Sequence, residues 1–141
     1  MTWFRCGMKD NSTQELNKLI DRTIERIKIF GTTYVNNYLC TNCTNLKYVE
    51  LDSNIDTIAT YSFYGCSALE TFIIRHNDVV IMGAAAISQS SIALPRGCNV
   101  YVPQAQINDY LSDATWGPFF DETTHPNNHL IAIEGSPYEE V

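Results

Sequence analysis

The chain has 141 residues, of which 45% are hydrophobic and 18% are charged, so it is long enough for one domain with a buried core and is not predicted to be disordered. Nine Lys and Arg residues stand against 16 Asp and Glu residues, which gives a net charge of -7. Because binding to nucleic acid or to an anionic membrane depends on positive charge, this composition disfavours both classes of partner.

The first ten residues are not expected to direct export through the Sec pathway. They lack a basic segment followed by an apolar run, and no window of the sequence reaches the about 18 consecutive apolar residues that a membrane-spanning helix needs. We therefore expect a protein that is made in the cytoplasm without a Sec signal peptide and that does not insert into a membrane. Five cysteines, an odd number, argue against a disulfide framework and predict free thiols, most of them buried.

A short helix is predicted near the N-terminus. Ser12 and Glu15 form a capping-box pattern just ahead of an apolar run, which places the helix from about Thr13 to Asp21. Residues 1–18 are assigned to an N-terminal extension with this capping helix. One alternative stays open, because the apolar residues up to Ile27 also fit a single longer amphipathic helix.

An internal repeat dominates the middle of the chain. Residues 35–51 and residues 58–74 superimpose without a gap at an offset of 23 positions, as in the pairing of Val35 with Ile58. Apolar residues meet apolar residues at the main aligned positions, which are Val35 with Ile58, Tyr38 with Tyr61, Cys40 with Phe63, Cys43 with Cys66, Leu46 with Leu69, Val49 with Phe72 and Leu51 with Ile74. Partial copies precede and follow this pair, so residues 19–102 are assigned to the repeats.

Each repeat is predicted to form one short strand and a return leg. Val49 and Leu51 alternate with Tyr48 and Glu50, which is the period of a strand with one buried side. A single unit cannot bury that side, so parallel stacking of the units must build one continuous core. The Tyr-x-Phe-x-x-Cys stretch then forms the return leg, with its aromatic and thiol side chains pointing inward. The same register predicts a strand at Ile24 to Ile29, which we prefer to the longer helix.

The C-terminal part is predicted to close the open end of the stack. An insertion that contains Pro95 breaks the repeat register, after which Val100 to Val102 form a strand. Residues 103–141 are assigned to a C-terminal cap and tail, and Pro103 suits the first turn of a helix. The expected elements are a helix through Ile107, Tyr110 and Leu111, a cover over the core at Trp116 to Phe120, a loop at Thr123 to Asn128, a last strand at Leu130 to Ile133 and a loose tail at Gly135 to Val141.

These residues resemble the repeat of BspA-like leucine-rich repeat proteins, whose unit runs approximately Cys-x-x-Leu-x-x-Ile-x-Ile, a variable turn and Ile-x-x-Tyr-Ala-Phe-x-x-Cys. Cys43 to Leu51 with Ile58 to Cys66 match this unit closely, and the resemblance extends over roughly Leu19 to Ile133. Cys40 departs from the family pattern, because it takes the place of a phenylalanine. The resemblance implies an α/β solenoid, a short leucine-rich-repeat stack of about four parallel strands, with an N-terminal helix and a C-terminal helical cap.

Members of this family include bacterial surface adhesins and, in short forms without a signal peptide, products of phage and prophage structural genes. The resemblance therefore implies a non-enzymatic structural or interaction module, similar to a short phage or prophage member, in a virion or on a cell surface. Its expected partners are protein, either an assembly partner or itself, or a cell-surface glycan. Because two full repeats leave the stack ends close to every part of the molecule, we also expect a homo-oligomer or a larger assembly.

Two patterns could carry chemistry, and both have a simpler structural explanation. Cys40 and Cys43 form a Cys-x-x-Cys, but the repeat accounts for each cysteine independently as a core residue. His125 and His129 have a spacing seen in metal sites, but Pro126 between them predicts an irregular loop rather than one helix face. We expect no cofactor, no metal ligand and no catalytic residue, and keep as the alternative a small metal- or thiol-dependent enzyme that uses these two pairs.

The polar side of the strands is the candidate binding surface, because side chains on rigid neighbouring strands cost little entropy to present. Register places Tyr48 beside Thr71, and Lys28 beside Glu50, all opposite the core. Ile73 is expected to stand outward as an apolar contact residue. The alternative is an ordinary solvated face in which Lys28 and Glu50 form a weak cross-strand pair. The candidate residues are Arg26, Lys28, Tyr48, Glu50, Thr71, Ile73 and Tyr101.

Overall fold

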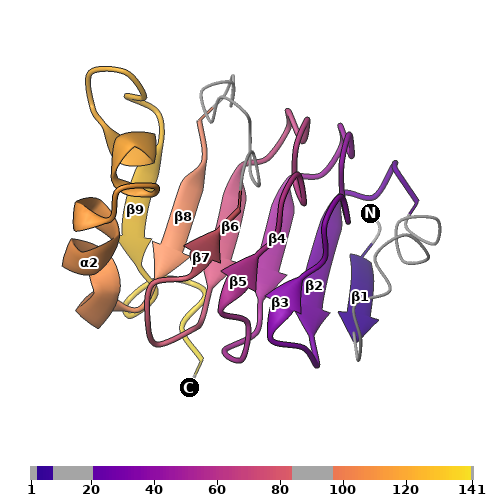
Figure 1. The fold of residues 1–141 in the computed structure, drawn as a ribbon, viewed down its shortest axis with the longest axis horizontal. Helices are drawn as coiled ribbons and strands as arrows, with labels where there is room; N and C mark the ends of the chain where they lie inside the picture. The colour runs from indigo at the N-terminus through magenta and orange to yellow at the C-terminus, as the bar shows by residue number, and fades with distance from the viewer. Residues whose placement is uncertain (1–2, 8–20, 84–96, 141) are drawn as a thin grey trace.

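The repeats wind the chain into a solenoid whose successive turns place their strands side by side (Figure 1). The computed structural model describes residues 3–7, 21–83 and 97–140. Within these ranges the elements are, in chain order, β1 (Trp3–Gly7), β2 (Arg26–Phe30), β3 (Tyr34–Val35), β4 (Tyr48–Leu51), β5 (Thr57–Ile58), β6 (Thr71–Ile74), β7 (Ile81–Met82), β8 (Asn99–Val102), the 3-10 helix η2 (Gln104–Gln106), α2 (Ile107–Ser112), the 3-10 helix η3 (Gly117–Phe120) and β9 (His129–Ala132). The predicted fold, a short α/β solenoid of parallel strands, is confirmed.

Two parallel sheets run along the solenoid. The main sheet has the strand order β1-β2-β4-β6-β8-β9, and the smaller sheet has the order β3-β5-β7. The smaller sheet lies in front of the main sheet in Figure 1, and α2 stands beside β9. Sequence patterns predict neither β1, which lies in the N-terminal extension and pairs with β2, nor the smaller sheet. The smaller sheet is missed because its strands have only two residues each, too few to show a period.

The offset of the repeat sets which residues lie side by side in the main sheet. Val49 pairs with Ile27 on one side and with Phe72 on the other, as the alignment predicts. β2 begins at Arg26, so a strand forms at this position rather than the end of a longer helix. Equivalent apolar side chains therefore lie above one another along the stack, which joins their buried sides into one core.

The core fills the space between the main sheet and the return legs. Phe63 from a return leg meets Phe72 from β6 edge to face, with ring centroids 5.2 Å apart. Four cysteines are buried in the described part of the chain, in agreement with the prediction of buried thiols: Cys40, Cys43, Cys66 and Cys98. Full burial of a large apolar side chain such as Phe63 or Phe72 stabilises the fold by about 1.5–3 kcal/mol.

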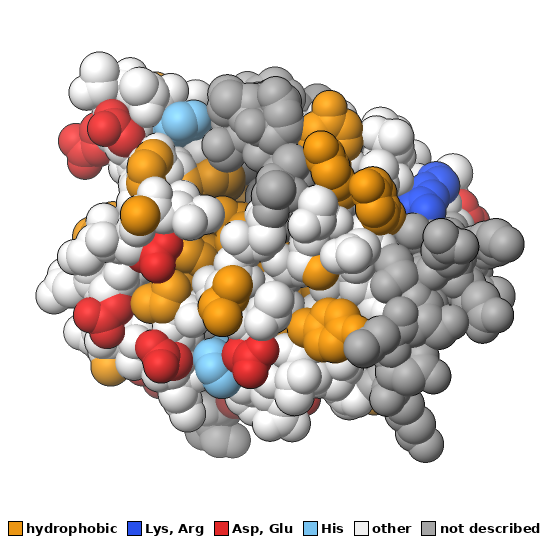
Figure 2. Space-filling view, viewed as in Figure 1, with side chains coloured by type: hydrophobic (Ala, Val, Ile, Leu, Met, Phe, Trp, Pro, Cys, Tyr) orange, Lys and Arg blue, Asp and Glu red, His pale blue; other side chains and the backbone are white. Residues whose placement is uncertain are grey.

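The return legs turn their tyrosines outward. Tyr38 and Tyr61 occupy equivalent positions in the repeat, and both have a left-handed backbone, with φ values of 60° and 58°. Their rings stack on each other with centroids 5.2 Å apart, and Tyr38 is exposed. Figure 2 shows hydrophobic side chains at the surface on this side of the molecule. The prediction of inward-pointing aromatic side chains is therefore confirmed for Phe63, which is buried, and wrong for the tyrosines.

A C-terminal cap covers the last turn of the stack. Trp116 is fully buried, and its Nε1 donates a hydrogen bond to the carbonyl oxygen of Val80 at 2.7 Å. Tyr110 from α2 is also buried, and its hydroxyl oxygen accepts a hydrogen bond from the Val80 N–H at 3.0 Å. Phe119 and Phe120 complete the aromatic cluster. The predicted helix after residue 103, the cover over the core and the last strand are confirmed.

Some predictions concern residues outside the described ranges. The sequence predicts an N-terminal helix at residues 13–21, and almost all of this segment lies in the undescribed range 8–20. The insertion that contains Pro95 lies in the undescribed range 84–96. Among the residues that the structure does describe, no helix combines the length and the hydrophobicity needed to cross a membrane.

Candidate functional site

The candidate site is the outer face of the main sheet, the side that points away from the core. Alternate residues of each strand project from this face, and parallel pairing arranges them in two ladders. In strand order, the ladders are Arg26, Tyr48, Thr71 and Asn99, and Lys28, Glu50, Ile73 and Tyr101. The structure thus places all seven predicted residues on one surface, in the pairing that the repeat offset predicts.

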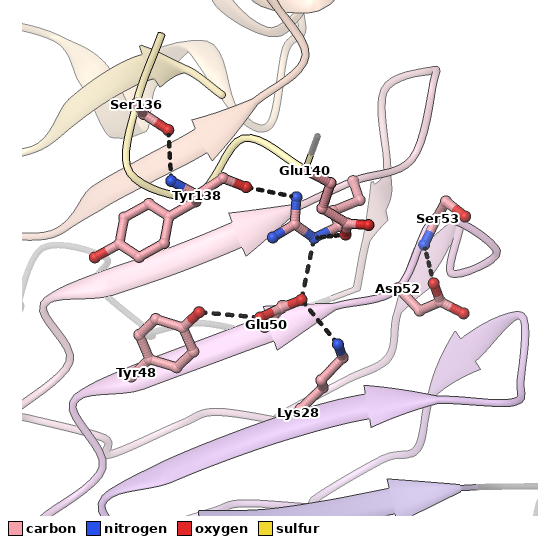
Figure 3. A network of polar contacts seen from close by, with 9 residues as sticks. Lys28, Tyr48, Glu50, Asp52, Ser53, Ser136, Tyr138 and Glu140 are labelled. Carbon is pink, nitrogen blue, oxygen red and sulfur yellow. Dashed lines mark hydrogen bonds and ion pairs between the residues drawn. The ribbon is translucent and has the colours of Figure 1, made fainter. Parts of the chain in front are cut away.

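Glu50 is the centre of a network of polar contacts on this face (Figure 3). Its carboxylate accepts a hydrogen bond from the Tyr48 hydroxyl at 3.0 Å and another from Nε of Arg75 at 3.1 Å. It also pairs with Nζ of Lys28, which is 3.2 Å away. Only 7% of Glu50 is exposed, so these three partners replace the water that the carboxylate loses on folding. The predicted pair of Lys28 and Glu50 is present as one part of this larger network.

The network holds Glu50 in its charged form. Burial acts to raise the pKa of this carboxyl, but the hydrogen bonds from Arg75 and Tyr48 and the charge of Arg75 outweigh it, so the pKa is lowered from its ordinary value of 4.5. Burial and the neighbouring Glu50 carboxylate raise the pKa of Tyr48, which keeps its hydroxyl protonated as a donor. The Arg26 guanidinium lies 4.3 Å from the centre of the Tyr48 ring, within cation–π distance. Glu50 and Tyr48 therefore keep their protonation states near neutral pH.

The C-terminal residues cross this face and attach to it. Nη1 of Arg75 donates a hydrogen bond to the carbonyl oxygen of Tyr138 at 2.9 Å, and Nε of Arg75 lies 2.9 Å from the Glu140 carboxylate. The Tyr138 ring lies near two rings of the face, with centroid distances of 5.9 Å to Tyr48 and 4.8 Å to Tyr101. The prediction of a loose tail is therefore wrong for the residues up to Glu140, because one arginine and two tyrosines hold them.

Ile73 stands on the outer side of β6 but is not exposed. Its exposed fraction is 0%, although the strand alternation directs it away from the core. β6 lies between β4 and β8, the strands that carry the two tyrosines in contact with Tyr138. The tail therefore covers this isoleucine, and the expectation of an exposed apolar contact residue is wrong. The burial of Ile73 instead contributes to holding the tail in place.

Three residues of this arrangement are absent from the sequence-based prediction. Arg75 follows directly after β6, so a basic residue at the end of a strand was the one available signal. Tyr138 and Glu140 gave no signal, because they belong to an irregular segment outside the repeat. The contact between Arg75 and Tyr138 joins residues 63 positions apart, and nothing in the local pattern of either residue predicts it.

Cys40 and Cys43 belong to the core of the repeats. Both are fully buried, and the Cys66 thiol donates a hydrogen bond to the Cys40 carbonyl oxygen at 3.1 Å. Nη1 of Arg22 donates to two backbone carbonyl oxygens of the same turn at 3.2 and 3.0 Å and lies 3.7 Å from the Cys43 sulfur. A hydrogen bond from Cys40, opposed by burial and assisted by Arg22, lowers the pKa of Cys43 to about 7. Burial raises the pKa of Cys40 well above its ordinary range.

The structure does not bring the cysteine pair and the histidine pair together. Nδ1 of His125 lies 3.0 Å from the carbonyl oxygen of Pro118, and His129 is exposed on β9. Cys43 precedes β4, which is three strands from β9, a separation of about 14 Å at a spacing of about 4.8 Å. Within the described ranges, no group of three or more His, Cys, Asp or Glu residues is arranged to hold a metal ion. In the described part of the chain, the two pairs therefore do not form one metal site.

The buried thiols are expected to react slowly in the folded protein. At neutral pH, alkylation of Cys40, Cys43, Cys66 and Cys98 should be at least about 100-fold slower than in denaturant, because each thiol must wait for local opening of the core. Peptide mapping by mass spectrometry after iodoacetamide treatment would measure each rate, and the denatured chain is the control. Fast labelling of Cys40 and Cys43 in the folded state would contradict the core assignment and support thiol chemistry.

Comparison with protein families identifies the repeat. The profile described as BspA type Leucine rich repeat region (6 copies) matches residues 21–100, which is more than half of the 141 residues. The matched range begins just ahead of β2 and ends in β8, so it covers the stacked turns that carry the outer face. Comparisons with curated proteins and with solved structures give no match.

Proposed function

Because the chain belongs to the BspA-type leucine-rich repeat family, we propose that it is a non-enzymatic interaction module that binds its partner through the outer face of the main sheet. Leucine-rich repeat domains generally mediate protein–protein interaction. The observation that carries the proposal is the two ladders of side chains on four adjacent, paired strands. The backbone of these strands is held by the sheet, so their side chains can be presented to a partner at little cost in conformational entropy.

The charge of the outer face supports the same proposal. Arg26, Lys28 and Arg75 give this face three positive charges against the two carboxylates of Glu50 and Glu140, whereas the whole chain has a net charge of -7. A local basic patch attracts acidic partners even when the whole chain is acidic. The outer face is therefore the surface on which an acidic protein segment is favoured.

We propose further that the chain acts within a larger assembly, in a phage virion or on a cell surface, as the short family members it resembles do. The favoured partner is protein, either an assembly partner or a second copy, and a cell-surface glycan is the second candidate. In the described part of the main sheet, β1 and β9 are the first and last strands. The C-terminal cap lies beside β9, so a neighbouring subunit would cover the β1 end and extend the stack there.

Site-specific photocrosslinking in the native particle or cell tests this proposal. A photoreactive residue replaces Thr71 on the outer face, and the matched control replaces Asp56, which is exposed directly before β5, the middle strand of the smaller sheet. The Thr71 position is expected to yield one dominant crosslinked partner, which is absent or at least about tenfold weaker from the Asp56 position. Equal crosslinking from both positions, or none from Thr71, would contradict binding through the outer face.

A further inference from the structure

We propose that the outer face is a docking site for an extended peptide that carries a tyrosine followed two residues later by a carboxylate, and that Tyr138 and Glu140 occupy this site within the same chain. This inference rests on the proposed function and names the chemistry of the partner. The tail then competes with the partner, because a partner segment must displace the tail in order to bind.

The Tyr138 ring lies between two tyrosine rings of the outer face, and we call this position the slot. Tyr101 forms one wall, with its ring edge to face against Tyr138 at 4.8 Å and 73°, and Tyr48 forms the other wall at 5.9 Å and 56°. Ile73 lies on the strand between the two walls, where its full burial gives the slot an apolar floor. A planar, mainly apolar side chain with a polar tip suits this slot, which favours tyrosine in the partner.

Arg75 contacts both the backbone carbonyl oxygen of the tyrosine and the acidic side chain two residues later. Its Nη1 donates to the Tyr138 carbonyl oxygen at 2.9 Å, a contact that any peptide can make. Its Nε lies 2.9 Å from the Glu140 carboxylate, a contact that requires an acid two residues beyond the tyrosine. Glu50 helps to hold the guanidinium in place, since it accepts from the same Nε at 3.1 Å and is itself paired with Lys28. The carboxylate is therefore recognised by a pre-positioned arginine, which is a geometry suited to specificity.

The connection to β9 explains why the tail fills the site in the isolated chain. Ser136 holds the start of the tail, because its N–H and its hydroxyl both donate to the Ile133 carbonyl oxygen, at 2.9 and 2.6 Å. The Ser136 hydroxyl oxygen in turn accepts from the Tyr138 N–H at 3.1 Å. A short tether of this kind gives the tail an effective concentration of about 1 mM at the site. A partner segment of equal intrinsic affinity would therefore bind the intact chain much more weakly than a chain whose tail cannot dock.

Peptide binding in trans tests the inference with the full-length chain. The double variant Tyr138→Ala and Glu140→Ala removes the side chains that fill the site but leaves Arg75, Tyr48 and Tyr101 unchanged. A fluorescent peptide with the sequence of residues 135–141 is titrated with the variant and with the unchanged chain, and binding is followed by fluorescence anisotropy. The variant is expected to bind the peptide at least about tenfold more tightly than the unchanged chain. Equal affinities would overturn the inference.

Two controls separate specific docking from general attraction of an acidic peptide. A peptide with Tyr138→Ala and a peptide with Glu140→Gln should each bind the variant at least about fivefold more weakly than the parent peptide. Adding Arg75→Gln to the variant should cause a similar loss. Equal binding of all three peptides would overturn the tyrosine and carboxylate requirement.

A milder variant keeps the test decisive if the double variant does not fold. Glu140 has a side chain that is 71% exposed, so Glu140→Gln in the full-length chain should leave the fold intact and strengthen peptide binding by about threefold. A chain that crosslinks a partner from residue 71 but binds none of these peptides keeps its role as an interaction module and loses only the peptide chemistry proposed here.

Discussion

Replacing Trp116 by alanine is expected to lower the free energy of unfolding by about 3–5 kcal/mol. The indole ring is fully buried at the end of the stack, where it packs against Tyr110 at 5.3 Å and against Phe120 at 6.5 Å. The substitution leaves a cavity between the cap and the last turn, and it also leaves the Val80 carbonyl oxygen without its 2.7 Å hydrogen bond from Nε1. Both effects act on the same contact between cap and repeats, so the last turn is expected to lose its cover.

Urea unfolding followed by far-UV circular dichroism would measure this loss. The matched control is Leu111→Ala, because Leu111 lies in the same cap but is 49% exposed, and its replacement should change stability by less than about 1 kcal/mol. A loss of less than about 1.5 kcal/mol for Trp116→Ala, or similar losses for the two variants, would show that the cap does not hold the end of the stack.

Replacing Glu50 by glutamine is expected to lower the free energy of unfolding at pH 7 by about 2 kcal/mol. The substitution keeps the shape of the side chain but leaves Lys28 and Arg75 without the charge that they share. Breaking a fully buried pair costs about 3–5 kcal/mol. The loss here is smaller, because the Lys28 side chain is 35% exposed and Arg75 retains its contact with Glu140. Guanidinium chloride would screen this interaction, so urea is the appropriate denaturant.

The effect of Glu50 should depend on pH with a defined sign. The pKa of Glu50 is lower in the folded chain than its ordinary value of 4.5, so the charged form stabilises the fold. This stabilisation is fully present above pH 4.5 and is lost as the pH falls through the lower pKa of the folded state. The difference in stability between the unchanged chain and Glu50→Gln should therefore be constant from pH 7 to about pH 5.5 and shrink in more acidic solution.

Glu122 provides a matched control for this titration. It is exposed in the loop after η3, so Glu122→Gln should change stability by less than about 0.5 kcal/mol at every pH. The Glu50 prediction fails if the difference between Glu50→Gln and the unchanged chain grows as the pH falls, because that outcome requires a raised pKa. It also fails if Glu50→Gln behaves like Glu122→Gln at pH 7.

The repeat spacing was sufficient to place the strands and their register. Val49 and Phe72 could be paired from the sequence because each turn of the solenoid packs against an equivalent turn, so the contact partner of a residue is its own counterpart 23 positions away. The same logic assigned Cys43 and Cys66 to the core, where both are buried. It also placed the polar ladders, because strand alternation puts Tyr48 and Glu50 on the side opposite Val49.

The repeat did not predict the direction of the return-leg tyrosines. Tyr38 and Tyr61 align with each other within a run of aligned apolar positions, and this alignment alone indicates an inward side chain. Their left-handed backbone conformation instead leaves the rings on the surface, stacked on each other. A conformation of this kind depends on the path of the whole turn, so the residue type at one position does not reveal it.

The sequence also did not predict which side chains of the outer face are covered by the tail. Alternation correctly directs Ile73 away from the core, but exposure depends on what else lies there, and the tail covers it. Arg75 meets Tyr138 only because the solenoid brings the end of β6 next to the segment that leaves β9, 63 positions later in the chain. Regular packing between neighbouring turns can be read from spacing, because it repeats. The contact between the tail and the outer face occurs once and does not repeat along the sequence. No sequence spacing therefore predicts it, and only the tertiary structure shows it.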